Sequence, residues 1–255
     1  MSKNFELLQD AQIRLDMPPI GESKASAAAN IGKTNGKRKG GHFNLESEAT
    51  REESLKLVQS LFLSRSEGTP RLVVFAGIDS GNGCSCICAN VAETLAEQKL
   101  GSVCLMDANL RSPVLPDLFG VTNHYGLTDA LSKNGSIRDF AKVVRSDNLW
   151  LLSCGSRPAQ SAGLLNSETM KVRVSELREE FDYVLIDSPP LNTYADGVAI
   201  AQLADGLVLV LEANSTRREA ALRVAENLRA AQIKILGAVL NKRTFPIPET
   251  LYKMM

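Results

Sequence analysis

The residue types best suited to chemistry occur in the segment GIDSGNGCSC, which follows an apolar run and leads into a helical pattern. Its glycines, Gly77, Gly81 and Gly83, allow the backbone to curl so that successive N–H groups point inward. The helix that follows adds unpaired N–H groups and the positive end of its dipole, and Ser85 offers a hydroxyl to magnesium. The segment predicts a phosphate-binding loop, for which a plain glycine turn is the alternative.

This loop lacks the lysine that normally precedes its final serine or threonine. The sequence reads Gly83-Cys84-Ser85 in place of Gly-Lys-Ser or Gly-Lys-Thr. A lysine there would form charge-assisted hydrogen bonds of roughly 1.5–3 kcal/mol each and would neutralise charge during phosphoryl transfer. Cys84 can do neither, so transfer is expected to suffer.

Acids stand at the ends of two other apolar runs. FDYVLIDSPP carries Asp187 where a carboxylate reaches magnesium or its bound water, and MDANLRSP carries Asp107 and Arg111. The alternative explanation of FDYVLIDSPP is a turn at the end of the strand that Pro189 and Pro190 close. Two acids and a glycine loop at three strand ends favour the magnesium–phosphate interpretation.

Three cysteines, Cys84, Cys86 and Cys88, follow the loop at alternate positions. Residues two apart on a helix do not share a face, so these thiols are not expected to bind one metal ion. They are interpreted as small residues packed near a tight turn. A lesser hypothesis is that the helix N-terminus lowers the pKa of Cys84 and makes it reactive.

The elements that must position these residues are short apolar runs alternating with helical patterns. Continuous Val, Leu and Ile runs are typical of strands buried on both faces, hence of a parallel sheet covered by helices. The sequence therefore predicts an α/β fold, a doubly wound and mainly parallel sheet of the P-loop NTPase type. The runs lie at 71–77, 102–108, 149–155, 182–188, 206–212 and 235–241.

The chain divides into four predicted parts. Residues 1–45 are a disordered and partly basic tail, because their composition cannot bury a core. Residues 46–66 form an amphipathic helix, residues 70–243 the P-loop domain, and residues 244–255 a short C-terminal tail. Lipid binding by the basic tail is the weaker alternative to a solvated linker.

Composition restricts the partners. Lys plus Arg total 29 and Asp plus Glu total 29, so no overall charge favours nucleic acid. No run approaches the length of a membrane helix, and the five cysteines show no paired framework. A cytoplasmic protein without disulfides is expected.

From about residue 50 to residue 241 the chain resembles the bacterial tyrosine kinases of capsule and exopolysaccharide biosynthesis, which are relatives of the MinD and ParA P-loop ATPases. The resemblance rests on the order and spacing of the glycine loop, VCLMDANLRSP, LLSCGSRPAQSAGLL, FDYVLIDSPP and ILGAVLN. It implies ATP or ADP with Mg²⁺ as cofactor. It also implies a membrane chain-length or export protein (a polysaccharide co-polymerase) as partner, a homo-oligomer, and a place at the inner membrane through that partner.

The resemblance also assigns residues by position. Asp107 looks like the acid of the second motif and Asp187 like the Walker B acid, and both join Arg111 as catalytic residues. Magnesium ligands would be Ser85, Asp107 and Asp187. The implied nucleotide-binding residues are Gly81, Asn82, Gly83, Cys84, Ser85, Cys86 and Asn241.

The sequence departs from the family at further positions besides the missing lysine of the loop. Asn109 stands where these kinases carry a second aspartate, and FPIPETLYKMM offers Tyr252 in place of a tyrosine cluster. In the helix that corresponds to the family's oligomerisation helix, Glu48 and Arg51 have the expected types, but Ser54 replaces a charged residue. Autophosphorylation and ring formation are therefore both expected to be weakened.

Three functions follow. The first is an ATP-dependent protein-tyrosine kinase in which another cation, such as Arg111, replaces the lysine. The second is a degenerate kinase acting as a regulatory binding module in polysaccharide export. The third is a MinD-like or ParA-like positioning ATPase, although such proteins carry a second lysine early in the loop, where Gly77-Ile78-Asp79-Ser80 has none.

Overall fold

A computed structural model of the protein describes residues 48–63, 68–156 and 163–243. The tails predicted at 1–45 and 244–255, with Tyr252, fall outside these ranges. In the ranges that are described, no helix combines the length and the apolar character needed to cross a bilayer.

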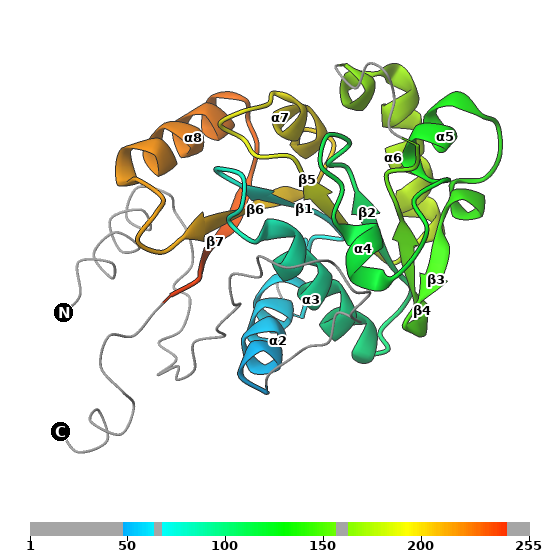
Figure 1. Ribbon diagram of the computed structural model, residues 1–255, viewed down its shortest axis with the longest axis horizontal. Coiled ribbons are helices and arrows are strands. Elements are labelled where there is room, and N and C mark those ends of the chain that lie inside the picture. The colour runs from blue at the N-terminus through cyan, green and yellow to red at the C-terminus, as the bar shows by residue number, and fades with distance from the viewer. Residues whose placement is uncertain (1–47, 64–67, 157–162, 244–255) are drawn as a thin grey trace, which may run out of the picture.

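A seven-stranded sheet in the order β3-β4-β2-β5-β1-β6-β7 forms the centre of the protein (Figure 1). Every neighbouring pair is parallel except β3 with β4. The predicted doubly wound, mainly parallel α/β fold is thus confirmed. The strands are β1 (Leu72–Gly77), β2 (Val103–Asp107), β3 (Lys142–Val144), β4 (Ser146–Leu152), β5 (Tyr183–Ser188), β6 (Gly206–Glu212) and β7 (Ile235–Asn241).

The antiparallel edge strand β3 was not predicted. It has only three residues, and its side chains pass from half-buried through exposed to buried, so it lacks the continuous apolar run by which the other strands were found. Its neighbour β4 starts at Ser146, before the apolar run begins, because Ser146 pairs with Val144 across the hairpin. An edge strand with one solvent-exposed face has a less apolar sequence than a central strand, so its pattern is harder to recognise.

Two hydrophobic cores lie on opposite faces of the sheet. Along β1, Leu72, Val74 and Ala76 pack into one core while Val73 and Phe75 pack into the other. This alternation follows from the two-residue period of a strand. Because both faces are covered, β1 is buried at every position, as the continuous apolar pattern predicts.

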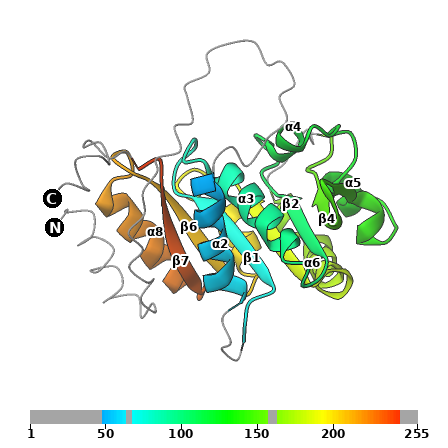
Figure 2. The same cartoon turned by 90° about the horizontal axis from the view of Figure 1, so that it is seen from below.

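The helices form a layer on each face (Figures 1 and 2). One layer contains α2 (Glu48–Phe62), α3 (Cys84–Glu97) and α4 (Leu115–Phe119). The other contains α5 (Leu127–Ser132), α6 (Glu168–Glu180), α7 (Asp196–Ala201), α8 (Arg218–Ala230) and the 3₁₀ turns η1 (Ile137–Phe140) and η2 (Leu164–Asn166). In Figure 2, α2 and α3 lie in front of the sheet.

Helix α2 packs its apolar face on the domain itself. Val58, Leu61 and Phe62 are buried in the core that α3 also lines, and the Phe62 ring meets Tyr183 edge-on at 5.7 Å between centroids. Arg51 adds an exposed ion pair of 2.8 Å to Glu97 of α3. The helix is therefore held by burial of its hydrophobic side chains, since an exposed ion pair contributes little.

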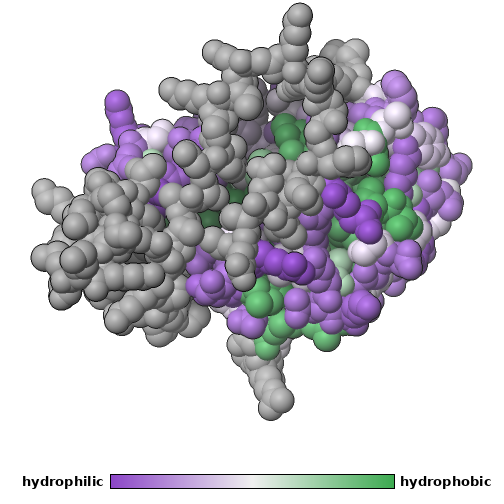
Figure 3. Space-filling model, turned by 60° about the horizontal axis from the view of Figure 1, so that its bottom comes forward, coloured by the Kyte–Doolittle hydropathy of each residue, from purple (hydrophilic) through white to green (hydrophobic). Residues whose placement is uncertain are grey.

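The outer surface is mostly polar. Where Figure 3 shows described residues, hydrophilic side chains predominate and hydrophobic ones form small patches. The large apolar side chains exposed in the described part of the chain are Leu100, Tyr125, Val143 and Val172, and no two of them share a helix or strand.

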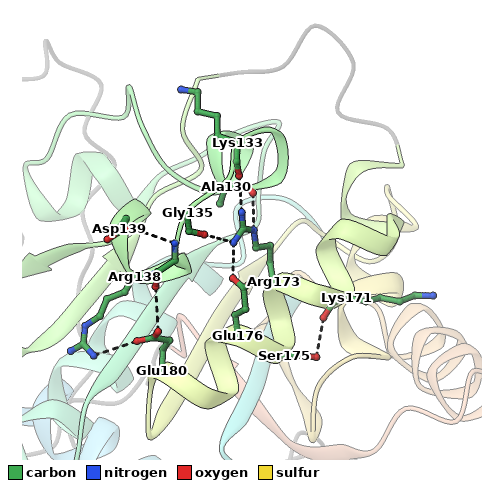
Figure 4. A network of polar contacts seen from close by, with 11 residues as sticks. Ala130, Lys133, Gly135, Arg138, Asp139, Lys171, Arg173, Ser175, Glu176 and Glu180 are labelled. Atoms are coloured by element: carbon green, nitrogen blue, oxygen red, sulfur yellow. Dashed lines mark hydrogen bonds and ion pairs between the residues drawn. The ribbon is translucent and has the colours of Figure 1, made fainter.

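A buried arginine ties α6 to α5 and to the segment between α5 and η1 (Figure 4). Arg173 is 7% exposed, and its Nε donates to the carbonyl of Ala130 at 2.8 Å. Its two terminal nitrogens donate to the carbonyls of Gly135 and Lys133, each at 2.7 Å, and one of them pairs with Glu176 at 2.6 Å. The guanidinium thus satisfies three backbone carbonyls that no helix pairs.

Replacing Arg173 by Met is expected to lower the free energy of unfolding by about 2 kcal/mol, because it leaves the buried carbonyl of Ala130 and two part-buried carbonyls without their donor. Lys171→Met is the matched control, since Lys171 lies on the same helix but forms only an exposed pair with Glu168 and should change stability by less than about 0.5 kcal/mol. Urea unfolding of both variants checks this. Equal effects of the two substitutions would contradict the role given to Arg173.

Candidate functional site

The glycine loop joins β1 to α3, and two of its glycines have left-handed backbone. The angle φ is 86° at Gly81 and 82° at Gly83, where any side chain adds strain. Gly83 is also the N-cap residue of α3, and a Cβ there would overlap the side-chain nitrogen of Asn241. At Gly81 a Cβ would meet nothing within 4 Å. Gly81 is thus required for conformation alone, and Gly83 for conformation and close approach.

Asn82 holds the loop from within. It is almost fully buried, its Oδ1 accepts from the N–H of Asp79 at 2.8 Å, and its Nδ2 donates to Thr216 at 3.2 Å. The carboxylate of Asp79 in turn accepts from Asn192 at 2.9 Å. Sequence analysis placed Asn82 at the nucleotide, but its side chain is bonded to the loop and to the β6–α8 connection. The contributions of Thr216 and Asn192 were missed, because no motif marks them.

The end of β7 contacts the loop from outside. Nδ2 of Asn241 donates to the carbonyl of Asn82 at 2.7 Å, and Nζ of Lys242 donates to the carbonyl of Gly81 at 2.7 Å. Lys242 also pairs with Glu212 at 3.1 Å. Asn241 was predicted to face a nucleotide base, whereas here its amide bonds to the loop. Lys242 was missed, although its position directly after the last apolar run could have indicated it.

Asp107 and Asp187 lie side by side. They are partners in the register of β2 and β5, and both are 0% exposed. Asp107 accepts hydrogen bonds from the N–H groups of Asn109 at 3.1 Å and of Val114 and Leu115 at 3.2 Å each. Burial and the charge of Asp187 raise the pKa of Asp107 well above its ordinary value, and the N–H groups oppose this. Asp107 therefore fixes the backbone that leads from β2 into α4.

Asp187 differs from Asp107 because neither of its buried carboxylate oxygens has a hydrogen-bond partner. Burial raises its pKa to about 6, and the Ser85 hydroxyl and the Cys84 thiol oppose the shift. These two groups face the carboxylate from the start of α3, but neither is in hydrogen-bonding geometry with it. A buried carboxylate without hydrogen-bond donors is costly, and this distinguishes Asp187 from Asp107.

The three cysteines of α3 do not match the lesser hypothesis of a reactive thiol. Burial, followed by the charge of Asp187, raises the pKa of Cys84 and Cys88 well above the ordinary value and also raises that of Cys86. The prediction of a lowered pKa for Cys84 is wrong, because an adjacent buried carboxylate and desolvation outweigh the helix N-terminus. Cys84 is a neutral thiol beside Asp187.

Arg111 lies at the same edge of the sheet but is bonded elsewhere. Its guanidinium stacks on the ring of Tyr194 at 4.3 Å from the centroid and bonds to Asp196 at 3.2 Å. Both partners lie after β5, at or near the start of α7. The predicted catalytic role of Arg111 therefore requires it to leave this pair. Nearby, Oδ1 of Asn109 accepts from the N–H of Ser112 at 3.3 Å and so serves a turn.

The residues present fit a hard cation bound together with phosphate. The Asp187 carboxylate and the Ser85 hydroxyl are oxygen ligands, and Mg²⁺ takes most of its ligands from water and phosphate. The described ranges contain no group of three or more His, Cys, Asp or Glu side chains placed to hold a metal ion alone. The structure thus brings together Gly81, Gly83, Ser85 and Asp187, with Asp107 beside them as a supporting residue.

Comparison with known proteins identifies relatives. A family model described as "ParA: NUBPL iron-transfer P-loop NTPase" matches residues 70–254. Tyrosine-protein kinase YwqD of Bacillus subtilis is 35% identical over 161 residues, which cover 63% of this chain and 68% of that protein. The succinoglycan biosynthesis transport protein ExoP of Rhizobium meliloti is 31% identical over 190 residues, which are 73% of this chain but 24% of that protein.

Solved structures support the same fold. The kinase domain of the Escherichia coli tyrosine kinase ETK superposes with a TM-score of 0.80 at 18% identity and covers 97% of this chain and 98% of that chain. The septum site-determining protein MinD of Pyrococcus horikoshii, complexed with Mg-ADP, gives a TM-score of 0.58 at 20% identity over 72% of this chain and 77% of that chain.

Proposed function

Because this chain belongs to the ParA-type P-loop NTPases and, among them, to the bacterial tyrosine kinases, we propose that it binds ATP or ADP with Mg²⁺ at the carboxyl edge of its sheet. The observation that carries this is the pair of buried, unpartnered oxygens of Asp187 beside Ser85 and the glycine loop. A cation there would remove the cost of burying the carboxylate.

Each residue has a part in binding. The N–H groups of the loop and of the first turn of α3 hold the phosphates, because a helix N-terminus leaves them unpaired. Ser85 and Asp187 would hold the magnesium ion, which would neutralise charge on the phosphates. Asp107 keeps the β2–α4 segment in place through three backbone hydrogen bonds.

The reaction we propose is transfer of the γ-phosphoryl group of ATP to a protein tyrosine. A bond forms between the tyrosine oxygen and phosphorus, the bond to the bridging oxygen breaks, and ADP leaves while the phenol proton passes to a base. The relationship to a tyrosine-protein kinase supports this. The setting would be capsule or exopolysaccharide biosynthesis, with a membrane export protein as partner, as the likeness to a succinoglycan biosynthesis transport protein supports. We propose self-assembly of the chain as well.

A specific observation favours a second candidate, a regulatory module that binds nucleotide without transferring phosphate. The lysine position holds a neutral thiol, Cys84, and Arg111, the substitute that the sequence suggested, is bonded to Asp196. Both features weaken stabilisation of the transferred group more than they weaken binding of the nucleotide.

Incubation with Mg-ATP followed by phosphotyrosine detection decides between the two. We expect the native chain to form phosphotyrosine and the Asp187→Asn variant to lose it. Binding of Mg-ADP without any phosphotyrosine would support the regulatory module. Phosphotyrosine formed equally by both proteins would contradict the site.

A further inference from the structure

The outer side of the glycine loop carries a lysine that the motif does not include. We propose that Lys242, which follows β7 and pairs with Glu212 at the end of β6, supplies the positive charge that Cys84 does not. Its hydrogen bond to the loop also turns the loop's N–H groups toward the phosphates of a nucleoside di- or triphosphate. This inference rests on the nucleotide binding proposed above, and it assigns a positioning residue to that site.

The first step is the direction of two peptide groups. Asn241 and Lys242 bond to the carbonyls of Asn82 and Gly81, each at 2.7 Å. In a trans peptide the N–H points opposite to the carbonyl. With these carbonyls held outward, the N–H groups of Asn82 and Gly83 are directed to the other side of the loop. Between described residues neither N–H donates a hydrogen bond, so both remain available to a phosphate.

The second step is charge. An ammonium bonded to a carbonyl polarises the peptide, so the N–H at the opposite end becomes a better donor. Lys242 therefore acts on the phosphate site through the Gly81–Asn82 peptide, whose carbonyl accepts the hydrogen bond from its ammonium group.

The third step concerns the backbone of Lys242 and the choice of a control. Lys242 has φ of 55°, in the left-handed region that residues other than glycine seldom adopt. Lys99, at the end of α3, has nearly the same backbone with φ of 54°, but it is exposed and lies at the opposite end of that helix from the loop. Lys99 is thus a control matched in residue type and in φ.

The test compares Mg-ADP binding by calorimetry in four proteins: the native chain, Lys242→Met, Lys242→Arg and Lys99→Met. We expect Lys242→Met to weaken binding about tenfold and to reduce the dependence of binding on salt, because one positive charge near the phosphates is lost. Lys242→Arg should keep both properties, and Lys99→Met should resemble the native chain. Melting curves without ligand show whether each variant is folded.

The outcomes separate this inference from the proposed function. Native binding with unchanged affinity in Lys242→Met would overturn the inference alone. The same holds if a folded Lys242→Arg binds as weakly as Lys242→Met, because charge would then not be the cause. No binding of Mg-ADP by the native chain would overturn both claims.

Discussion

Replacing Asp187 by Asn is expected to stabilise the metal-free protein while it removes magnesium-dependent nucleotide binding. The buried carboxylate has a pKa of about 6, which is above its value in the unfolded chain. The folded protein therefore holds a proton that the unfolded chain releases, and this stability is fully present below about pH 4 and lost as the pH rises through about 6. At neutral pH the native chain should be less stable than the variant by on the order of 2–3 kcal/mol.

Thermal melts with a chelator, from pH 4.5 to pH 7.5, check this prediction. The difference between native chain and variant should grow with pH, because only the native chain has a carboxyl group that ionises at position 187. Asp205→Asn is the control, because this substitution should lower the stability instead of raising it. Burial favours the neutral form of Asp205, but the N–H groups of Leu72 and Arg71 and the guanidinium of Arg178 outweigh burial and lower the pKa. A native chain as stable as Asp187→Asn at every pH would contradict the arrangement described for Asp187.

Restoring the lysine by Cys84→Lys is expected to strengthen binding of Mg-ATP by about tenfold to a hundredfold. Each charge-assisted hydrogen bond to a phosphate contributes roughly 1.5–3 kcal/mol, and about 1.4 kcal/mol corresponds to a factor of ten. The new ammonium would also lie beside Asp187, so the pKa of that carboxyl should fall. Phosphotyrosine formation should rise together with affinity, because the lysine acts on the transferred group.

Calorimetry with Mg-ATP measures the gain, and Cys86→Lys is the matched control. Cys86 follows two residues later on α3, so its side chain points to a different face of the helix. An equal gain from both substitutions would show a general effect of charge. No gain from Cys84→Lys would contradict the view that the loop retains the geometry of a phosphate site and lacks only its cation.

The sequence predicted the architecture well because the central strands are buried on both faces. The six apolar runs correspond to β1, β2, β4, β5, β6 and β7. Helix α2, predicted at 46–66, was found at Glu48–Phe62. The strand β3 was missed because pairing at a sheet edge depends on a neighbour and leaves little trace in three residues.

The site was predicted in part. Motifs located the glycine loop, Asp107 and Asp187, since each directly follows or ends a strand. They did not show that Asp107 is hydrogen-bonded to the chain while Asp187 is not, because this depends on how the β2–α4 segment folds back. The pKa of Cys84 was predicted in the wrong direction because burial and the charge of Asp187 outweigh the effect of the helix N-terminus. Lys242 was missed because its contact with the loop joins residues far apart in sequence.

The central claim is that Asp187 and the glycine loop together form a site for a magnesium nucleotide. Its most direct test is calorimetric titration of Mg-ADP into the native chain, repeated with ADP and a chelator. We predict saturable binding with one nucleotide per chain that is weakened at least about tenfold without magnesium. Absence of binding, or binding of the same strength without magnesium, would contradict the claim.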